Sequence, residues 1–167
     1  INLINKISES SGHLGIAGGQ YLDLSYEHKK IPKKKIIDME IKKTGKLFSF
    51  CCVAPLILKN KNKNEIKKFE NIGADIGLLF QVADDLIDHR GSFLAAGKKT
   101  GKDKKKGKAT LISLLGYNNT IKYANNLIIK IKRKIKKYGP KSKNLSETLD
   151  YILKRNKWKK STNFWTK

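Results

Sequence analysis

The chain has 167 residues, of which 39% are hydrophobic and 31% charged, and its formal net charge is +23. This length suffices for one domain with a hydrophobic core, and apolar residues that recur at helical spacing almost throughout exclude a disordered tail. No run approaches the ~20 apolar residues that a membrane span needs, and no signal peptide is visible, so we expect a cytoplasmic protein.

The positive charge leaves nucleic acid, an anionic membrane surface and a phosphorylated substrate open as ligands. Of the 37 basic residues only three are arginine, namely Arg90, Arg133 and Arg155. Nucleic-acid-binding proteins rely on the planar arginine side chain, so this composition disfavours a nucleic-acid partner. We interpret most lysines as solvated helix faces, with a basic patch for RNA or lipid as the alternative.

The first part of the chain predicts two helical regions. Residues 4–26 combine apolar side chains at helical spacing with a glycine pair at 18–19, which favours closely packed helices. Pro32 predicts the start of a second region, which extends to Leu58. The lysine and asparagine residues at 59–64 then predict a solvated turn.

The next region has the clearest apolar stripe in the first half of the chain, and it predicts one long helix. Gly91 is expected to end this helix, and the glycine- and lysine-rich residues 91–108 are expected to form a loop. The stripe consists of Phe69, Ile72, Ile76, Leu79, Phe80, Ala83 and Ile87.

The remaining residues also predict helices. Helical spacing resumes near Ala109, breaks at Gly116 and the polar residues 118–120, and continues over 121–138. A Gly-Pro pair directly afterwards would end that helix, and a last helix is expected over about 145–158. Because no segment reads convincingly as a strand, the fold class predicted is all-α.

Acidic residues gather in the segment G-L-L-F-Q-V-A-D-D-L-I-D, residues 77–88. On a helix, Gln81, Asp84 and Asp88 share one face, with Asp85 at its border, so three carboxylates are expected to converge. They lie near a helix C-terminus, where negative charge is disfavoured, and a cation would offset this. Hard oxygen ligands without histidine or thiolate suit Mg2+; the alternative is a solvated acidic face paired with lysines.

The following segment, G-K-K-T-G-K-D-K-K-K-G-K-A-T at residues 97–110, suits phosphate binding. Its backbone amides and lysine charges can surround phosphate oxygens, with Lys98 and Lys108 as the flanking cations. A Mg2+ site beside such a loop indicates a diphosphate or triphosphate ligand. For residues 104–106, a disordered lysine linker is the alternative reading.

These segments together resemble the trans-isoprenyl diphosphate synthases, or polyprenyl synthetases. The run F-Q-V-A-D-D-L-I-D and the loop after it look like the second aspartate-rich motif of that family. A-G-G-Q-Y-L-D-L at 17–24 resembles its G-G-Q-x-x-D-L helix, and K-K-T-G at 42–45 its lysine-threonine pair. L-D-Y-I-L-K-R-N-K at 149–157 is similar to the C-terminus of bacterial farnesyl diphosphate synthases.

The resemblance implies that residues 1–167 are the C-terminal portion of a single helical domain, part of the isoprenoid synthase bundle. The family's first aspartate-rich motif and its isopentenyl diphosphate lysines lie upstream of this region and are not in the sequence. The implied activity is Mg2+-dependent prenyl transfer from an allylic diphosphate (dimethylallyl or geranyl) to isopentenyl diphosphate, by a homodimer in the full-length protein. Product length cannot be read from these residues.

The resemblance also implies roles for individual residues. Gln20 and Asp23 would face the same cavity as the motif residues, or alternatively orient neighbouring helices. The implied catalytic and substrate-binding residues are Lys43, Thr44, Gln81 and Lys98, with Lys108 as a further phosphate contact and Asp84, Asp85 and Asp88 as Mg2+ ligands.

Two alternatives to an active enzyme remain at this point. One is a truncated or non-catalytic family member, which the missing first motif makes credible. The other is a lysine-rich module that binds nucleic acid or lipid. We expect no turnover by the 167-residue chain alone, because half of the metal-binding residues are missing from it.

Overall fold

The computed structural model describes residues 2–95 and 107–154, and every regular element within these ranges is helical. The all-α prediction is therefore confirmed. In chain order the elements are α1 (Asn2–Ser11), α2 (Ile16–Ser25), α3 (Lys33–Glu40), the π-helical turn η1 (Ile41–Gly45), α4 (Lys46–Leu58), α5 (Lys63–Ala95), α6 (Leu111–Leu115), α7 (Tyr117–Ile135), the 3-10 segment η3 (Lys136–Ser142) and α8 (Lys143–Lys154).

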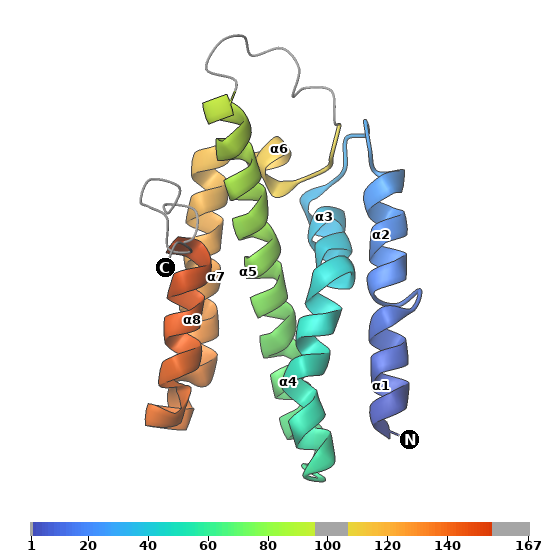
Figure 1. Ribbon diagram of the computed structural model, residues 1–167, viewed down its shortest axis with the longest axis vertical. Helices are drawn as coiled ribbons and strands as arrows, with labels where there is room; N and C mark the ends of the chain where they lie inside the picture. Colours follow the sequence, from blue (N-terminus) through green and yellow to red (C-terminus); the bar gives the residue numbers. More distant parts are fainter. Residues whose placement is uncertain (1, 96–106, 155–167) are drawn as a thin grey trace, which may run out of the picture.

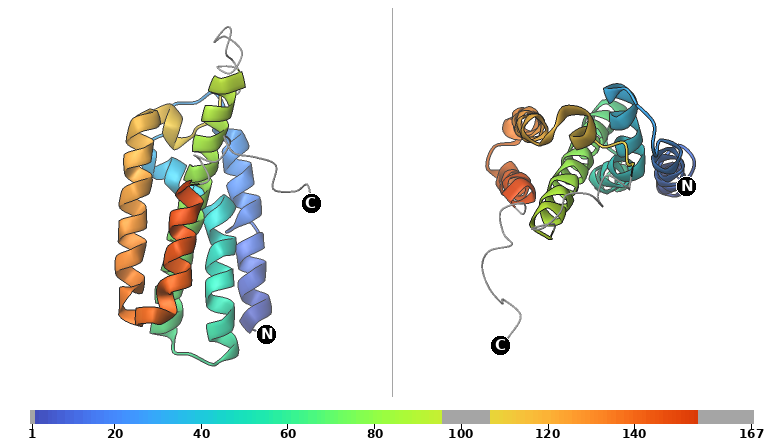
Figure 2. Two further views of the ribbon diagram at one scale, coloured as in Figure 1. Left: turned by 60° about the vertical axis from the view of Figure 1, so that its left-hand side comes forward. Right: turned by 90° about the horizontal axis from the view of Figure 1, so that it is seen from above.

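The long helix α5 runs through the centre of the bundle, and most other elements pack along it (Figure 1). On one side α5 contacts α4 and η1, and on the other it contacts α7 and α8. Helices α1 and α2 form an outer layer against α4, η1 and α3, as the end-on view in Figure 2 shows. The second half of α5 rises to the end of the bundle where α6 lies (Figure 1).

The hydrophobic core forms where α5 faces α7 and α8, because the predicted apolar stripes meet there. Phe69, Phe80 and Ile87 of the predicted α5 stripe are only partly buried, whereas Leu86 is fully buried. The buried hydrophobic residues of these three helices are Ile72, Ile76, Leu78, Leu79, Val82, Ala83, Leu86, Ala124, Leu127, Ile128, Ile131, Ile135, Leu149 and Ile152.

Helix α5 does not end at Gly91, as the sequence predicts, but continues to Ala95. A glycine inside a helix costs only about 1 kcal/mol relative to alanine, which a helix this long tolerates. The predicted loop therefore loses its first five residues, 91–95, to the helix, and residues 96–106 lie outside the described ranges. Although α5 has 33 residues, neither it nor any other helix in the described ranges is apolar enough to cross a membrane.

Helix α7 begins at Tyr117, and the break predicted at residues 118–120 is wrong. These polar residues stabilise the first turn of the helix with side-chain hydrogen bonds. The Thr120 hydroxyl donates to the carbonyl of Gly116 over 2.9 Å, and the Asn119 amide donates to the carbonyl of Leu115 over 3.0 Å. Only Gly116, at φ 78°, separates α6 from α7.

The end of α7 also differs from the prediction. The helix stops at Ile135 and tightens into η3, and the Gly139-Pro140 pair makes a kink inside that segment at φ 57°. Helix α8 then starts at Lys143, two residues before the predicted start. The predicted continuation of the last helix to residue 158 lies partly outside the described residues.

Candidate functional site

A narrow cavity of about 30 Å³ lies between α2, α3, η1, α5 and the segment that precedes α6. It brings together four of the residues that the sequence singles out, together with Asp23 and Glu40. Its lining consists of Asp23, Met39, Glu40, Lys43, Gln81, Asp85, Lys108, Ala109 and Thr110. A wider groove of about 520 Å³ between α7 and η3 contains none of the predicted residues.

Two glycines allow the π-helical turn η1 to lie close between α2 and α5. A side chain at Gly19 of α2 would place its Cβ 2.2 Å from the backbone nitrogen of Lys43. A side chain at Gly77 of α5 would place its Cβ 2.6 Å from the Cα of Gly45. Of the glycine pair predicted to permit close packing, Gly19 does so at this site, whereas Gly18 lies against the backbone of His13. The turn itself interrupts the continuous helix predicted for residues 33–58, and π-turns of this kind are frequent at functional sites.

Lys43 of η1 forms an ion pair with Asp23 of α2, with 2.5 Å between Nζ and Oδ2. Asp23 is only 8% exposed, so this carboxylate is largely removed from water and needs its partner. Gln20, on the same helix, is exposed and is not among the cavity residues. Asp23 thus has both of the positions that the sequence left open: it lines the cavity, and its ion pair connects α2 to η1.

Thr44, Gln81 and Asp85 form a chain of hydrogen bonds from η1 to α5. The Thr44 hydroxyl donates to Oε1 of Gln81 over 3.0 Å, and Nε2 of Gln81 donates to Oδ1 of Asp85 over 3.1 Å. The amide is oriented by both of its partners, which fixes the direction of the Asp85 carboxylate. Three predicted site residues are therefore connected.

The pKa of the Asp85 carboxyl is raised from 3.8 to about 6, and burial is the main cause. The hydrogen bond from Gln81 lowers this pKa, and so does the positive charge of Lys108. The neighbouring carboxylates Asp88 and Asp84 raise it. A carboxyl group whose pKa is raised this far has too few cations and hydrogen-bond donors around it to stabilise its charge in the free chain. Such a group is expected where a further cation or ligand binds.

Asp84 is partly buried and Asp88 is exposed, and both lie outside the cavity lining. In the described part of the chain, no three acidic, histidine or cysteine side chains are grouped closely enough to hold a metal ion. The charges of Asp88 and Asp84 nevertheless reach Asp85, as expected for residues one to three positions apart on a helix. Metal binding by these residues stays a prediction.

The two predicted lysines of the phosphate loop have different outcomes. Lys98 lies outside the described residues, whereas Lys108 lines the cavity. The chain returns to the bundle at Gly107, whose carbonyl accepts from the backbone nitrogen of His28 over 2.8 Å. At φ 47° and with a hypothetical Cβ 2.3 Å from the His28 ring, this position requires glycine. A reciprocal cap between Thr110 and Ser113 then starts α6.

Glu40, the last residue of α3, is a cavity residue that the sequence reading missed. It is only 2% exposed, and the pKa of its carboxyl is raised well above the usual value. Burial is the main cause, and the charges of Asp85 and Asp23 add to it while Lys43 opposes it. The available signal was its position three residues before Lys43, on the same side of a helical segment.

The fold and the site define an all-helical protein with a cavity that combines lysines, an oriented amide and carboxylates, a set of groups suited to a phosphorylated ligand. Residues 2–151 match the polyprenyl synthetase family, and the chain belongs to that family. The resemblance noted in the sequence is thereby confirmed.

Curated relatives agree with this assignment. The farnesyl diphosphate synthase of Micrococcus luteus is 36% identical over 157 residues, which cover 94% of this chain and 54% of that protein. The farnesyl diphosphate synthase of Escherichia coli (strain K12) is 34% identical over 161 residues, which cover 94% and 54%. The chain thus spans about half the length of these relatives.

Solved structures give the same picture of the fold. A geranyltransferase from Helicobacter pylori, complexed with magnesium and isoprenyl diphosphate, matches with a TM-score of 0.73 and 28% identity. The match covers 92% of this chain and 50% of that one. A farnesyl/geranylfarnesyl diphosphate synthase from Zymomonas mobilis matches with a TM-score of 0.74 and 32% identity, over 91% and 49%. The helical bundle is therefore part of the isoprenoid synthase fold.

Proposed function

We propose that this chain supplies the allylic-diphosphate half of a Mg2+-dependent prenyltransferase, of the farnesyl or geranyl type. The observation that carries this proposal is the convergence of Lys43, Gln81, Asp85 and Lys108 on one cavity. Two lysines there can neutralise phosphate oxygens, and the oriented amide of Gln81 can direct a ligand. The solved relative that holds magnesium and isoprenyl diphosphate supports the same class of ligand.

The acidic residues of α5 fit Mg2+ as part of a larger site. Asp84 and Asp88 lie one helical turn apart, and Asp85 borders the cavity. Mg2+ typically takes one or two carboxylates and completes its shell with phosphate oxygens and water, so a group of three protein ligands is not required. Bound Mg2+ would neutralise negative charge on the diphosphate, with Asp84 as the principal ligand and Asp85 and Asp88 as further ones.

In this proposal the residues of the chain act on the allylic diphosphate as its C1–O bond breaks. Lys43 and Lys98 bind the diphosphate oxygens, on which negative charge grows as the leaving group takes the electron pair. Lys108 adds a further positive charge. Thr44 and Gln81, which are hydrogen-bonded to each other, place their oxygen dipoles towards the allylic cation and stabilise it.

The second substrate is isopentenyl diphosphate, whose double bond attacks the cation and which then loses a proton to the departing diphosphate. Its binding residues and the first aspartate-rich motif are not in this sequence. We therefore propose that the 167 residues are the C-terminal portion of one domain, that the whole protein is a homodimer, and that this portion alone does not turn over.

Isothermal titration calorimetry with inorganic diphosphate tests the proposal on the chain itself. We expect binding that strengthens when Mg2+ is added, and a loss of about tenfold or more on Lys43→Met, because a charge-assisted hydrogen bond disappears. The matched control is Lys137→Met, an exposed lysine of η3, which should bind as the unchanged chain does. Asp84→Ala should remove the strengthening by Mg2+. Equal binding by the Lys43 and Lys137 variants would refute the site.

A further inference from the structure

The carboxyl group of Glu40 has an unusual position in this bundle. In the described part of the chain, its Oε2 is the one buried side-chain polar atom that has no hydrogen-bond partner. Folded proteins pair nearly all such atoms, because an unpaired buried group keeps the full cost of losing its water. The unpaired Oε2 therefore indicates that Glu40 bonds to a group that binds to the protein.

The missing partner is not one of the cavity residues around Glu40. Lys43, whose charge acts on Glu40, is already bonded to Asp23, and the amide of Gln81 is bonded to both Thr44 and Asp85. The charges of Asp23 and Asp85 repel an ionised Glu40, and together with burial they raise its pKa well above the usual value. A carboxyl group that is removed from water, lacks a partner for one oxygen and faces two other acids favours its neutral form, which has an O–H to donate.

The size of the cavity limits what that O–H can reach. A volume of about 30 Å³ accommodates one or two water molecules or a single phosphate oxygen, but no complete diphosphate. A cation cannot accept a hydrogen bond, so it is not a partner for the O–H of a protonated carboxyl group. The groups left to accept from Glu40 are a water and an oxygen of a ligand bound between Lys43 and Lys108.

We propose that Glu40 is a further ligand-contacting residue of this pocket, whose carboxyl group donates a hydrogen bond to an oxygen of the bound diphosphate, directly or through one water. This inference rests on the proposed function of the same site. Other acids of the bundle have structural partners: the partly buried Glu70 is bonded to two lysines, and so is the buried Asp75. Glu40 differs because Lys43 and Gln81, which line the same cavity, are bonded to other groups.

Two substitutions separate a ligand contact from a packing role. Glu40→Gln keeps the shape and an N–H donor, so inorganic diphosphate should bind within about twofold of the unchanged chain. Glu40→Leu removes the donor, so binding should weaken about tenfold, equally with and without Mg2+. Glu147→Gln and Glu147→Leu, at an exposed position of α8, are the matched controls and should change neither value.

Thermal unfolding without ligand gives a second readout. Glu40→Leu should raise the melting temperature, because it removes an unpaired buried polar group, whereas a structural role for Glu40 requires a fall. If the leucine variant does not fold, Glu40→Met replaces it in both measurements, since methionine fits irregular space more easily.

The binding measurements on the Glu40 variants either support or refute the inference. Full binding by the leucine variant, or binding by the glutamine variant as weak as that of leucine, would overturn the inference while the proposed function stands. A loss confined to Mg2+-containing solutions would also overturn it, since the contact would then be to the hydrated metal. If the unchanged chain itself binds no diphosphate, the proposed function fails and the inference fails with it.

Discussion

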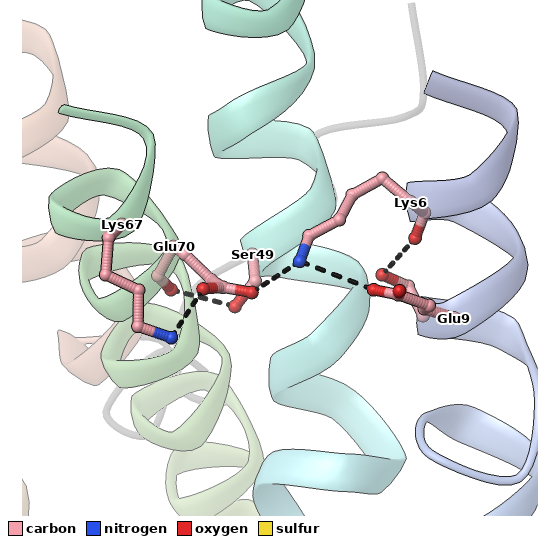
Figure 3. A network of polar contacts seen from close by, with 6 residues as sticks. Lys6, Glu9, Ser49, Lys67 and Glu70 are labelled. Carbon is pink, nitrogen blue, oxygen red and sulfur yellow. Dashed lines mark hydrogen bonds and ion pairs between the residues drawn. The ribbon is translucent and has the colours of Figure 1, made fainter. Parts of the chain in front are cut away.

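Two lysine-carboxylate clusters lie at opposite ends of α5 and differ in how completely their charges are paired. Near the start of α5, Glu70 accepts from Lys6 over 2.7 Å and from Lys67 over 2.8 Å (Figure 3). Its backbone carbonyl also accepts from the hydroxyl of Ser49 over 2.9 Å, which ties α4 to α5. Beside the second half of α5, Glu40 has an unpaired oxygen, and among the described residues the Asp85 carboxylate accepts a hydrogen bond from the neutral amide of Gln81.

The difference appears directly in the acidity of these groups. Burial alone would raise the pKa of Glu70, but the hydrogen bonds and charges of Lys6 and Lys67 outweigh it and lower the pKa to about 2. At Asp85 burial prevails, and the pKa rises to about 6. The same residue types therefore stabilise the bundle at one end and are left poorly paired at the other. Groups arranged in that second way are typical of binding sites.

The largest effect is expected from a change that separates η1 from α5 and leaves the Glu70 cluster intact. Gly77→Val would place a branched side chain against the backbone of Gly45, where the Cβ alone comes within 2.6 Å. We expect a loss of about 3 kcal/mol in the free energy of unfolding, measured with urea, and loss of diphosphate binding.

The matched control for Gly77→Val is Asn71→Val, at an exposed position of the same helix, which should stay within about 0.5 kcal/mol of the unchanged chain. Stability should still depend on acid in the Gly77 variant, because Glu70 and its lysine partners lie about two helical turns before Gly77. If Gly77→Val bound diphosphate normally, close contact between η1 and α5 would not be needed for the site.

Asp85→Asn should have the next largest effect, and it should stabilise the free chain. The folded chain holds the Asp85 proton more tightly than the unfolded chain, so stability falls as pH rises from 3.8 to about 6 and stays reduced above that. Asparagine avoids this loss, which is at most about 3 kcal/mol at pH 7. Urea unfolding at pH 3.5 and pH 7 measures it, with Glu147→Gln as the control. A variant less stable than the unchanged chain at pH 7 would mean that Asp85 is well paired.

Most of the bundle follows from the sequence, because apolar spacing decides which helix faces meet. The stripes on α5 and α7 were predicted and form the core. The errors fall at helix ends, where single residues act through their surroundings. Gly91 lies within a helix that continues past it, and Asn119 and Thr120 begin a helix rather than break one.

The site was predictable where a motif carries it and not where packing makes it. Lys43, Gln81 and Lys108 meet at the cavity as the motifs suggested, although these residues come from distant parts of the chain. The position of Glu40 three residues before Lys43 places it on the same helical side but does not predict its burial, since a glutamate in a lysine-rich segment normally faces water. Its burial results from the contact of α3 and η1 with their neighbours, which no local pattern encodes.

Glu70→Gln should have the smallest of these effects and the opposite sign to Asp85→Asn. The unfolded chain binds the Glu70 proton more tightly, so the stability that the cluster provides is complete above pH 4.5 and is lost as pH falls to about 2. Because both lysines are partly solvated, we expect a cost of only about 1 to 2 kcal/mol at pH 7. Urea unfolding across this pH range should show the stabilities of the variant and of the unchanged chain converging in acid.

The control is Lys67→Met, at the more exposed partner, which should cost less than about 0.5 kcal/mol. A difference between Glu70→Gln and the unchanged chain that persists at pH 2 would mean that the side chain acts by shape and not by charge, and the contrast between the two ends of α5 would then be lost.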